Sequence, residues 1–417
     1  ETDNSQETDN SQETDNSQET DNSQQTAGTK ETKEFTEREN KIIFYMINFI
    51  SNIYEPVASG TDENSIYHRG GGGIGLVFTE EKTTSTSTLT KRGIEVEFEE
   101  CRFEGNQVRR GSESEPANQD ECDGGSIYFS EDTNEGATLK SLIINRCEFK
   151  SNKATNNGGA IYLHGGQQLE KFHVTNSEFD DNKCNKASGA IYIISESEIA
   201  LKDCIFTKNS ASTSQESEST SLTDCNCGSL YLVTKEHSPS ASISNCTFNS
   251  NKASNDFGAL YLEVAEKYSP ITLNNCTFAS NEAGGRGGAI GLDSTASESF
   301  MFSITDCIFE SNSAKVESGG IYARNKGSLT IDSCKFTNNK AAFKEATDGQ
   351  EPGDSEEIAA RILEDENQKG NCGALYLASS EASSIMAVVD CIFEGNKAEG
   401  KGGAVYLDAD SVDSSFA

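Results

Sequence analysis

Eight tyrosines recur at one position of a repeated hexapeptide and are the best candidate binding residues in this sequence. The hexapeptide reads GGAIYL at Gly158–Leu163 and GGAVYL at Gly402–Leu407. A row of exposed rings can stack on sugars or anchor a protein interface. Alternatively, the rings can stack on one another along a sheet and stabilise it without binding anything. The eight are Tyr128, Tyr162, Tyr192, Tyr231, Tyr261, Tyr322, Tyr376 and Tyr406.

Other side chains that could carry catalysis do not gather in the sequence. Enzymes that act on polysaccharides need clustered carboxylates for acid and base work, and here the carboxylates are scattered. The four histidines fall in no repeated or paired pattern. No phosphate-binding loop and no nucleophile elbow is found. The sequence therefore predicts a protein that is not an enzyme and that uses no cofactor.

The cysteines predict packing rather than metal binding. Eight of the 13 occupy one position of a Cys-x-Phe motif, and Ser177 occupies it in a ninth copy. A replaceable cysteine fits a small buried apolar residue better than an obligate disulfide, although disulfides remain open in an oxidising compartment. Cys225 and Cys227 lack zinc spacing and a second pair. The sequence therefore predicts no metal site.

A second repeated motif predicts a ladder of asparagines. It places the Phe of Cys-x-Phe three residues before an Asn, as in ITLNNCTFASNEA at Ile271–Ala283. If successive copies stack, their amides lie in one column and can hydrogen-bond to one another. The predicted ladder comprises Asn106, Asn152, Asn182, Asn209, Asn251, Asn281, Asn312, Asn339 and Asn396.

The elements that must position these residues are short strands. Both motifs alternate apolar and polar residues with period two and are bounded by Gly, Asn and Ser. Two or three strands per repeat, at a period of 27 to 31 residues in the shortest copies, describe one coil of a parallel β-helix. Alternation predicts that Ile and Leu of AIYL point inward and that Ala and Tyr point outward. The Cys and Phe of the second motif should point inward.

Repeat boundaries divide the chain into three parts. Residues 1–40 begin with four copies of ETDNSQ, contain few apolar residues and are predicted to be disordered. Residues 41–69 are predicted to cap the solenoid, because an open strand edge invites aggregation. Residues 70–417 are predicted to form about ten coils, with insertions at 107–121, 210–226 and 340–371.

Composition excludes some partners. The 417 residues carry a formal net charge of −34, and only 34% of them are apolar. An acidic chain lacks the basic surface that nucleic-acid binding requires. It would also be repelled by an anionic membrane, and no segment has the ~20 apolar residues of a spanning helix. Contact with a membrane would need an anchor that this sequence does not contain.

The alternating GGA[ILV] and F-x-x-N motifs resemble those of the polymorphic membrane proteins of chlamydiae. They are also similar to β-helix surface proteins of parasitic protists such as trichomonads. The resemblance covers residues 70–417 and implies an all-β, right-handed parallel β-helix, a single-stranded solenoid like that of pectate lyases. It also implies exposure at the cell surface or secretion, and attachment to a host-cell protein or glycan receptor.

Two alternatives remain open at this point: a carbohydrate-active β-helix enzyme, which would be a polysaccharide lyase or hydrolase, and a purely structural coat or spacer. The motif Asn-x-Thr also marks Asn245 and Asn275 as possible N-glycosylation sites. They matter only in a eukaryotic secretory pathway.

Overall fold

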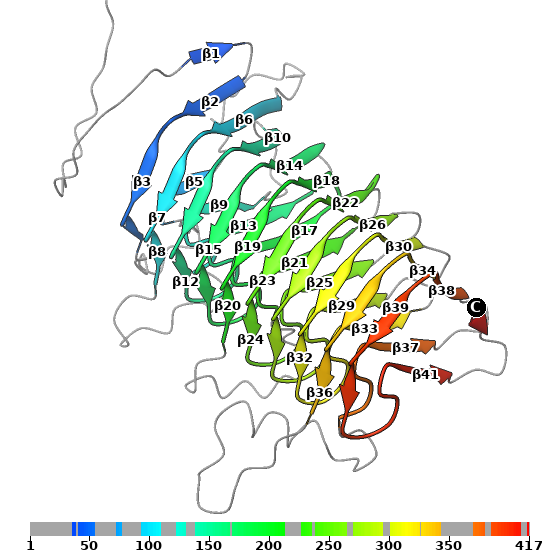
Figure 1. The fold of residues 1–417 in the computed structure, drawn as a ribbon. Helices are drawn as coiled ribbons and strands as arrows, with labels where there is room; N and C mark the ends of the chain where they lie inside the picture. The colour runs from blue at the N-terminus through cyan, green and yellow to red at the C-terminus, as the bar shows by residue number, and fades with distance from the viewer. Residues whose placement is uncertain are drawn as a thin grey trace, which may run out of the picture. The chain divides into compact units, whose positions relative to one another are not determined.

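The structure is a computed structural model. It describes residues 36–38, 41–54, 72–76, 93–109, 122–130, 138–166, 169–212, 227–235, 238–264, 270–294, 301–325, 327–342, 370–379, 385–409 and 415–416 (Figure 1). All of them belong to one compact unit, Lys33–Ala417. Of the predicted disordered tail, only residues 36–38 are described, and they form a strand. No described residue belongs to a helix that could span a membrane.

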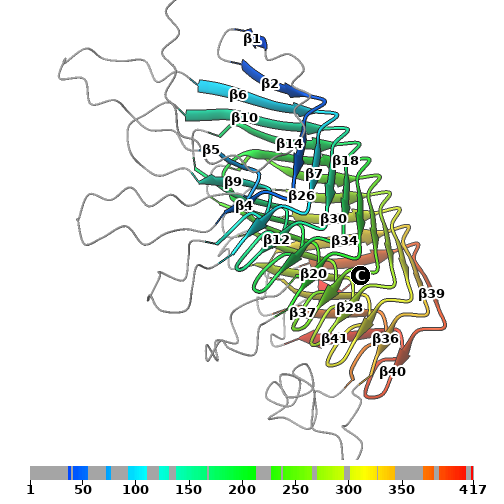
Figure 2. The ribbon, with the colours of Figure 1, turned by 90° about the vertical axis from the view of Figure 1, so that its left-hand side faces the viewer.

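Four sheets, named A to D here, run along the solenoid, and each coil contributes one strand to each of them. Strands of successive coils lie side by side (Figures 1 and 2). All the pairings are parallel except that of β1 with β2, which is antiparallel.

Sheet A contains β1 (Thr36–Arg38), β2 (Lys41–Tyr45), β6 (Gly93–Glu99), β10 (Thr138–Asn145), β14 (Lys171–Thr175), β18 (Glu198–Lys202), β22 (Ala241–Ser244), β26 (Ile271–Asn274), β30 (Met301–Thr305), β34 (Ser328–Asp332), β38 (Ile385–Val389) and β42 (Ser415–Phe416). Sheet B contains β3 (Asn48–Ile50), β7 (Arg102–Glu104), β11 (Glu148–Lys150), β15 (Glu178–Asp180), β19 (Ile205–Thr207), β23 (Thr247–Asn249), β27 (Thr277–Ala279), β31 (Ile308–Glu310), β35 (Lys335–Thr337) and β39 (Ile392–Glu394).

Sheet C contains β4 (Ile53–Tyr54), β8 (Gln107–Val108), β12 (Lys153–Ala154), β16 (Lys183–Cys184), β20 (Ser210–Ala211), β24 (Lys252–Ala253), β28 (Glu282–Ala283), β32 (Ser313–Ala314), β36 (Lys340–Ala341) and β40 (Lys397–Ala398). Sheet D contains β5 (Ile74–Leu76), β9 (Ile127–Ser130), β13 (Ile161–Gly165), β17 (Ile191–Ser195), β21 (Leu230–Thr234), β25 (Leu260–Val264), β29 (Ile290–Ser294), β33 (Ile321–Asn325), β37 (Leu375–Ser379) and β41 (Val405–Ala409).

The predicted right-handed parallel β-helix is confirmed, and the described strands make up ten coils. Each coil has four strands instead of the two or three predicted, because the second motif bends twice. Asn275 (φ 50°) separates β26 from β27, and Ser280 (φ 56°) separates β27 from β28. Residues in this left-handed region turn the chain sharply. Equivalent residues occupy the same two corners in the other coils.

Phenylalanines of sheet B form one unbroken column inside the solenoid. Their ring centroids lie 4.6–5.0 Å apart, with ring planes within 9° of parallel. The predicted inward direction of Phe and of Ile and Leu in AIYL is therefore confirmed, as Ile161 and Leu163 are fully buried. The column contains Phe49, Phe103, Phe149, Phe179, Phe206, Phe248, Phe278, Phe309, Phe336 and Phe393.

The prediction that Ala of AIYL faces outward is wrong. Ala160 and Ala190 are fully buried and belong to the main core. Each precedes its strand, since β13 begins at Ile161 and β17 at Ile191. Strict alternation therefore does not extend to it, and a small side chain fits beside the buried phenylalanines.

The asparagine ladder is confirmed along its whole predicted length. Each Nδ2 donates to the Oδ1 of the next coil's Asn at 2.9–3.1 Å. The same nitrogen donates to a phenylalanine carbonyl of the preceding coil, as Asn182 does to Phe149 at 2.9 Å. Because these buried amides have their partners, burying them leaves little uncompensated desolvation cost.

The cysteines of the Cys-x-Phe motif are free thiols that take part in hydrogen bonds between coils. The backbone N–H of Cys276 donates to Sγ of Cys307 at 3.4 Å, and the N–H of Cys307 donates to Sγ of Cys334. Ser177 plays the same part, accepting from the N–H of Cys147 at 3.1 Å. No disulfide joins any two of the described cysteines, and Cys225 lies outside the described residues.

Two predicted boundaries need correction. Residues 41–54 lie within the predicted cap, yet they form the strands β2, β3 and β4, which pair in parallel with the second coil. Asn52 even begins the ladder, donating to Asn106 at 2.8 Å. The predicted insertions also start two residues too early, since β8, β20 and β36 belong to sheet C. Most of each insertion lies outside the described residues.

Candidate functional site

The predicted tyrosines all lie on the outer side of sheet D, where parallel register brings them into one column. Tyr162 pairs with Tyr128 on one side and with Tyr192 on the other. Stacked neighbours have ring centroids 4.7–5.4 Å apart. The sequence therefore located the column correctly.

The expected exposure of this column is found only in part. Tyr162, Tyr192, Tyr231 and Tyr406 are half-buried. The remaining four are buried, and three of them, Tyr261, Tyr322 and Tyr376, belong to a second apolar cluster on the outer side of sheet D. The buried members are Tyr128, Tyr261, Tyr322 and Tyr376.

Stacking also limits what the column can bind. Tyr192 has the ring of Tyr162 at 5.1 Å on one side and that of Tyr231 at 4.7 Å on the other, with all planes within 7° of parallel. Both π faces are thus covered by neighbouring rings. A ligand reaches the ring edges, which carry positive partial charge. Face-on stacking of a sugar, which the sequence suggested, has no room within this part of the column.

A local exchange of residues interrupts the column in the seventh coil. Gly291 stands where eight of the other nine coils have Tyr, and Phe257 stands where most others have Gly or Ser at the start of the hexapeptide. The Phe257 ring stacks on Tyr261 at 5.0 Å. A Cβ on Gly291 would lie 2.2 Å from that ring. Phe257 thus fills the place that a tyrosine at 291 would take.

Charged residues gather beside the same column in coils six to ten. Nη2 of Arg286 lies 2.9 Å from Oδ2 of Asp256, whose side chain is only 4% exposed. The Arg286 guanidinium lies 5.1 Å from the centre of the Tyr322 ring, at cation–π distance. Nη2 of Arg324 donates to the Tyr322 hydroxyl at 3.3 Å. These contacts explain why Tyr322 is buried.

Glu317 is the buried acid of this group. It is 5% exposed, and its backbone pairs with Arg286 on one side and with Asn371 on the other. Burial raises the pKa of Glu317 to about 7, although Arg286 and Arg324 oppose the rise. In the adjoining coils, the Tyr376 hydroxyl donates to Oδ2 of Asp408 at 2.8 Å.

Sequence reasoning missed this charged group. Asp256, Arg286 and Glu317 each come directly before a hexapeptide, so stacking was bound to place them in one column. The signal was therefore present in successive coils. Two other members of the charged group, Arg324 and Asp408, follow the tyrosines in the sequence, where the motif does not fix the residue type.

Asn245 and Asn275 lie at the corner between sheets A and B, at φ of 53° and 50°. Both side chains are exposed, as predicted for glycosylation acceptors. Nδ2 of Asn275 donates to Oδ1 of Asn245 at 2.9 Å, and Nδ2 of Asn245 donates to Oδ1 of Asp203 at 3.0 Å.

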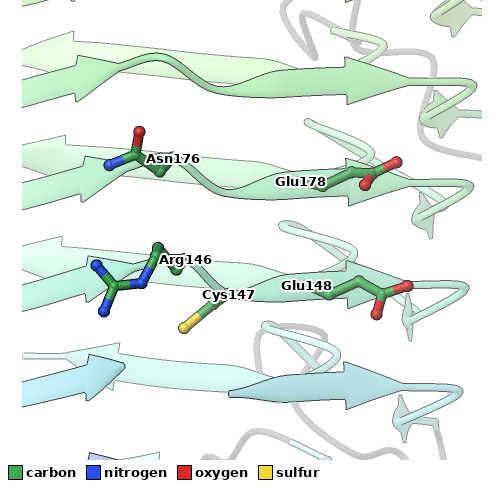
Figure 3. A pocket seen from close by; sticks show the side chains of 5 residues that line it. All are labelled: Arg146, Cys147, Glu148, Asn176 and Glu178. Atoms are coloured by element: carbon green, nitrogen blue, oxygen red, sulfur yellow. The ribbon is translucent and has the colours of Figure 1, made fainter. Parts of the chain in front are cut away.

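A shallow, open hollow lies at the same corner two to four coils away (Figure 3). Glu148 and Glu178 stand side by side on β11 and β15. Oε2 of Glu148 lies 3.3 Å from Nη1 of Arg102, and Nε of Arg146 donates to Glu100 at 3.0 Å. Glu178 is solvent-exposed and the Glu148 side chain is 37% exposed, so the hollow does not shield a reaction from water.

No described part of the chain brings together three His, Cys, Asp or Glu side chains that could hold a metal ion.

A family model described as a right-handed β-helix region matches residues 120–298 and 236–416 of the chain. No curated protein and no solved structure gives a significant match.

Proposed function

The chain belongs to the family of proteins with a right-handed β-helix region, and from this premise we propose that it is a non-enzymatic attachment protein. It would be displayed at a cell surface or secreted, and it would bind a host-cell protein or glycan receptor. A solenoid suits this work because the same side chain recurs in every coil, so many weak contacts add up. Nucleic acid would not be a partner.

One observation carries the proposal. Tyr162, Tyr192 and Tyr231 are consecutive, half-buried and stacked, so three ring edges are accessible at a fixed spacing. Rings held in this way lose little conformational freedom on binding. Aromatic residues that are already ordered are frequent anchors of protein interfaces.

The GGA[ILV] and F-x-x-N motifs support the same reading. They are the residues that resemble the polymorphic membrane proteins of chlamydiae and similar surface proteins of protists. We propose that the chain is related to these surface proteins and that it lies outside the cell.

The test is binding of the purified chain to a glycan array and to host cells. A triple variant, Tyr162→Ser with Tyr192→Ser and Tyr231→Ser, should lose at least tenfold in affinity. Tyr45→Ser is the matched control, because Tyr45 is 41% exposed on sheet A, away from the column. Equal binding by the triple variant and the control would remove the tyrosine column from the proposal. Absence of any binding would favour the structural coat or spacer.

A polysaccharide lyase or hydrolase is the second candidate, and Glu317 is the observation that favours it. A carboxyl group with a pKa of about 7 is suited to act as a general acid near neutral pH. Its 5% exposure argues for a structural charge instead. Assays on uronic-acid and neutral polysaccharides decide the matter: turnover that Glu317→Gln abolishes would replace attachment with catalysis.

A further inference from the structure

Lysines concentrate at one outward position of the solenoid, the first residue of each two-residue strand of sheet C. Five of the ten coils have Lys there, and all five side chains are exposed. Figure 2 shows several of these strands, from β12 to β40, in one row. The lysine column consists of Lys153, Lys183, Lys252, Lys340 and Lys397.

Parallel register places like charges directly beside each other in this column. Lys153 pairs with Lys183, and Lys340 pairs with Lys397. Adjacent strands lie about 4.8 Å apart, and like charges facing each other at that distance destabilise a sheet. The fold does not require lysine here, because Ser210 and Ser313 occupy the same position. The lysines therefore carry a cost that packing does not explain.

The column is basic, whereas the chain as a whole is strongly acidic. The full sequence has 68 acidic and 34 basic residues, yet the ten column positions include only one acid, Glu282, which binds Lys252 at 3.0 Å. Lys183 is paired with Asp181 at 2.9 Å. Lys153, Lys340 and Lys397 form no ion pair with another described residue. On sheets A and B, by contrast, Lys41 pairs with Glu97 and Arg102 with Glu148.

We propose that the lysine column binds a linear polyanionic polysaccharide, such as a sulfated glycan, that runs across the strands from coil to coil. The column extends over seven steps from Lys153 to Lys397, or about 34 Å at ~4.8 Å per coil. The paired lysines at its two ends are the main contacts, and Lys252 lies between them. This surface is distinct from the tyrosine column of sheet D.

Shape and surroundings favour a polysaccharide over nucleic acid. The column is one side chain wide and is bordered on sheet B by acids such as Asp180, Glu310 and Glu394. A duplex would bring its phosphates against these acids. A single strand is usually held by aromatic rings that stack on its bases, and none of the ten column positions is aromatic. A thin polymer that is recognised by charge alone fits best.

The test measures binding of dextran sulfate, uncharged dextran and single-stranded poly-dT to the full chain. The quadruple variant Lys153→Gln, Lys183→Gln, Lys340→Gln and Lys397→Gln should bind dextran sulfate at least tenfold more weakly. Its dependence on salt should also be shallower, by roughly 0.7 per lost contact on a single-stranded polymer. Uncharged dextran should not bind.

The matched control removes four other exposed lysines, through Lys140→Gln, Lys171→Gln, Lys202→Gln and Lys335→Gln, so that both variants have the same net charge. The control should bind dextran sulfate within twofold of the unchanged chain, and so should the tyrosine triple variant. Equal losses in the two lysine variants would show a diffuse charge effect and overturn the proposal. Lysine-dependent binding of poly-dT as tight as that of dextran sulfate would overturn the choice of ligand.

Discussion

The two aromatic columns of this solenoid differ in how strictly they are kept. The phenylalanine column inside sheet B is unbroken through ten coils, with rings within 9° of parallel. The tyrosine column outside sheet D is interrupted by Gly75 and Gly291, and Tyr231 and Tyr261 are tilted by 29°. A missing ring at an inner position cannot be replaced by another side chain. At an outer position, a side chain of the neighbouring coil can fill the space, as Phe257 does beside Gly291.

Removal of one inner ring should cause the largest loss of stability. Phe206→Ala should lower the free energy of unfolding by about 3–5 kcal/mol, because the neighbouring coils cannot close over the cavity. Tyr192→Ala, at a half-buried outer position, should lower it by roughly half as much. Chemical denaturation of both variants checks this expectation. Equal losses would mean that the outer column is as essential as the inner one.

Glu317 tests the electrostatics of the outer face. Its pKa is raised to about 7, so the folded chain binds a proton that the unfolded chain releases near pH 4.5. Stability from this group should therefore fall as pH rises from about 4.5 to 7 and level off above that. Glu317→Gln should stabilise the chain by up to about 3 kcal/mol at pH 8 and have little effect at pH 4. Unfolding of both proteins at the two pH values measures it, and a difference that does not change with pH would contradict it.

Phe257 and Gly291 test whether a residue of a neighbouring coil can replace a missing outer ring. Gly291→Tyr alone should cost about 1–3 kcal/mol, because its side chain meets Phe257. Phe257→Gly alone should also destabilise, since it leaves a gap beside Tyr261. The double variant should approach the stability of the unchanged chain. A double-mutant cycle measures the coupling, and simple additivity of the two losses would show that the residues do not compensate each other.

The smallest effect is expected at the thiol column. Cys276→Ser should change the free energy of unfolding by less than about 1 kcal/mol, because Ser177 already makes the equivalent hydrogen bonds: it accepts at 3.1 Å and donates to Thr175 at 2.8 Å. Cys276→Val, which removes the hydrogen bonds and keeps the volume, is the companion variant and should cost more. A large loss for the serine variant would show that sulfur itself is required.

The repeated motifs predicted the inner architecture because they state it directly. Phe and Asn recur three residues apart, so stacking alone fixes the phenylalanine column and the asparagine ladder. The first three strands of the first coil were missed because Ile47 replaces the motif cysteine and no Ala follows Asn52. The two-residue strands of sheet C are too short to show alternation, so no sequence pattern indicated the lysine column.

The outer site could be placed from sequence but not characterised. The position of each tyrosine follows from register, whereas its exposure depends on side chains of other coils, such as Arg286 over Tyr322. The pKa of Glu317 likewise depends on burial among residues that no motif links to it. Contacts outside the repeat are set by individual residues, and these vary from coil to coil.

The asparagine ladder has a consequence for how such a chain evolves. Every inner rung bonds to an identical rung in the preceding coil and in the following coil, so these hydrogen bonds do not depend on how many rungs there are. A gene segment that encodes one coil can be duplicated or lost by recombination, and the remaining rungs meet the same partners as before. The length of the solenoid is thus free to vary between related genes, while selection acts on the outward residues that each copy carries.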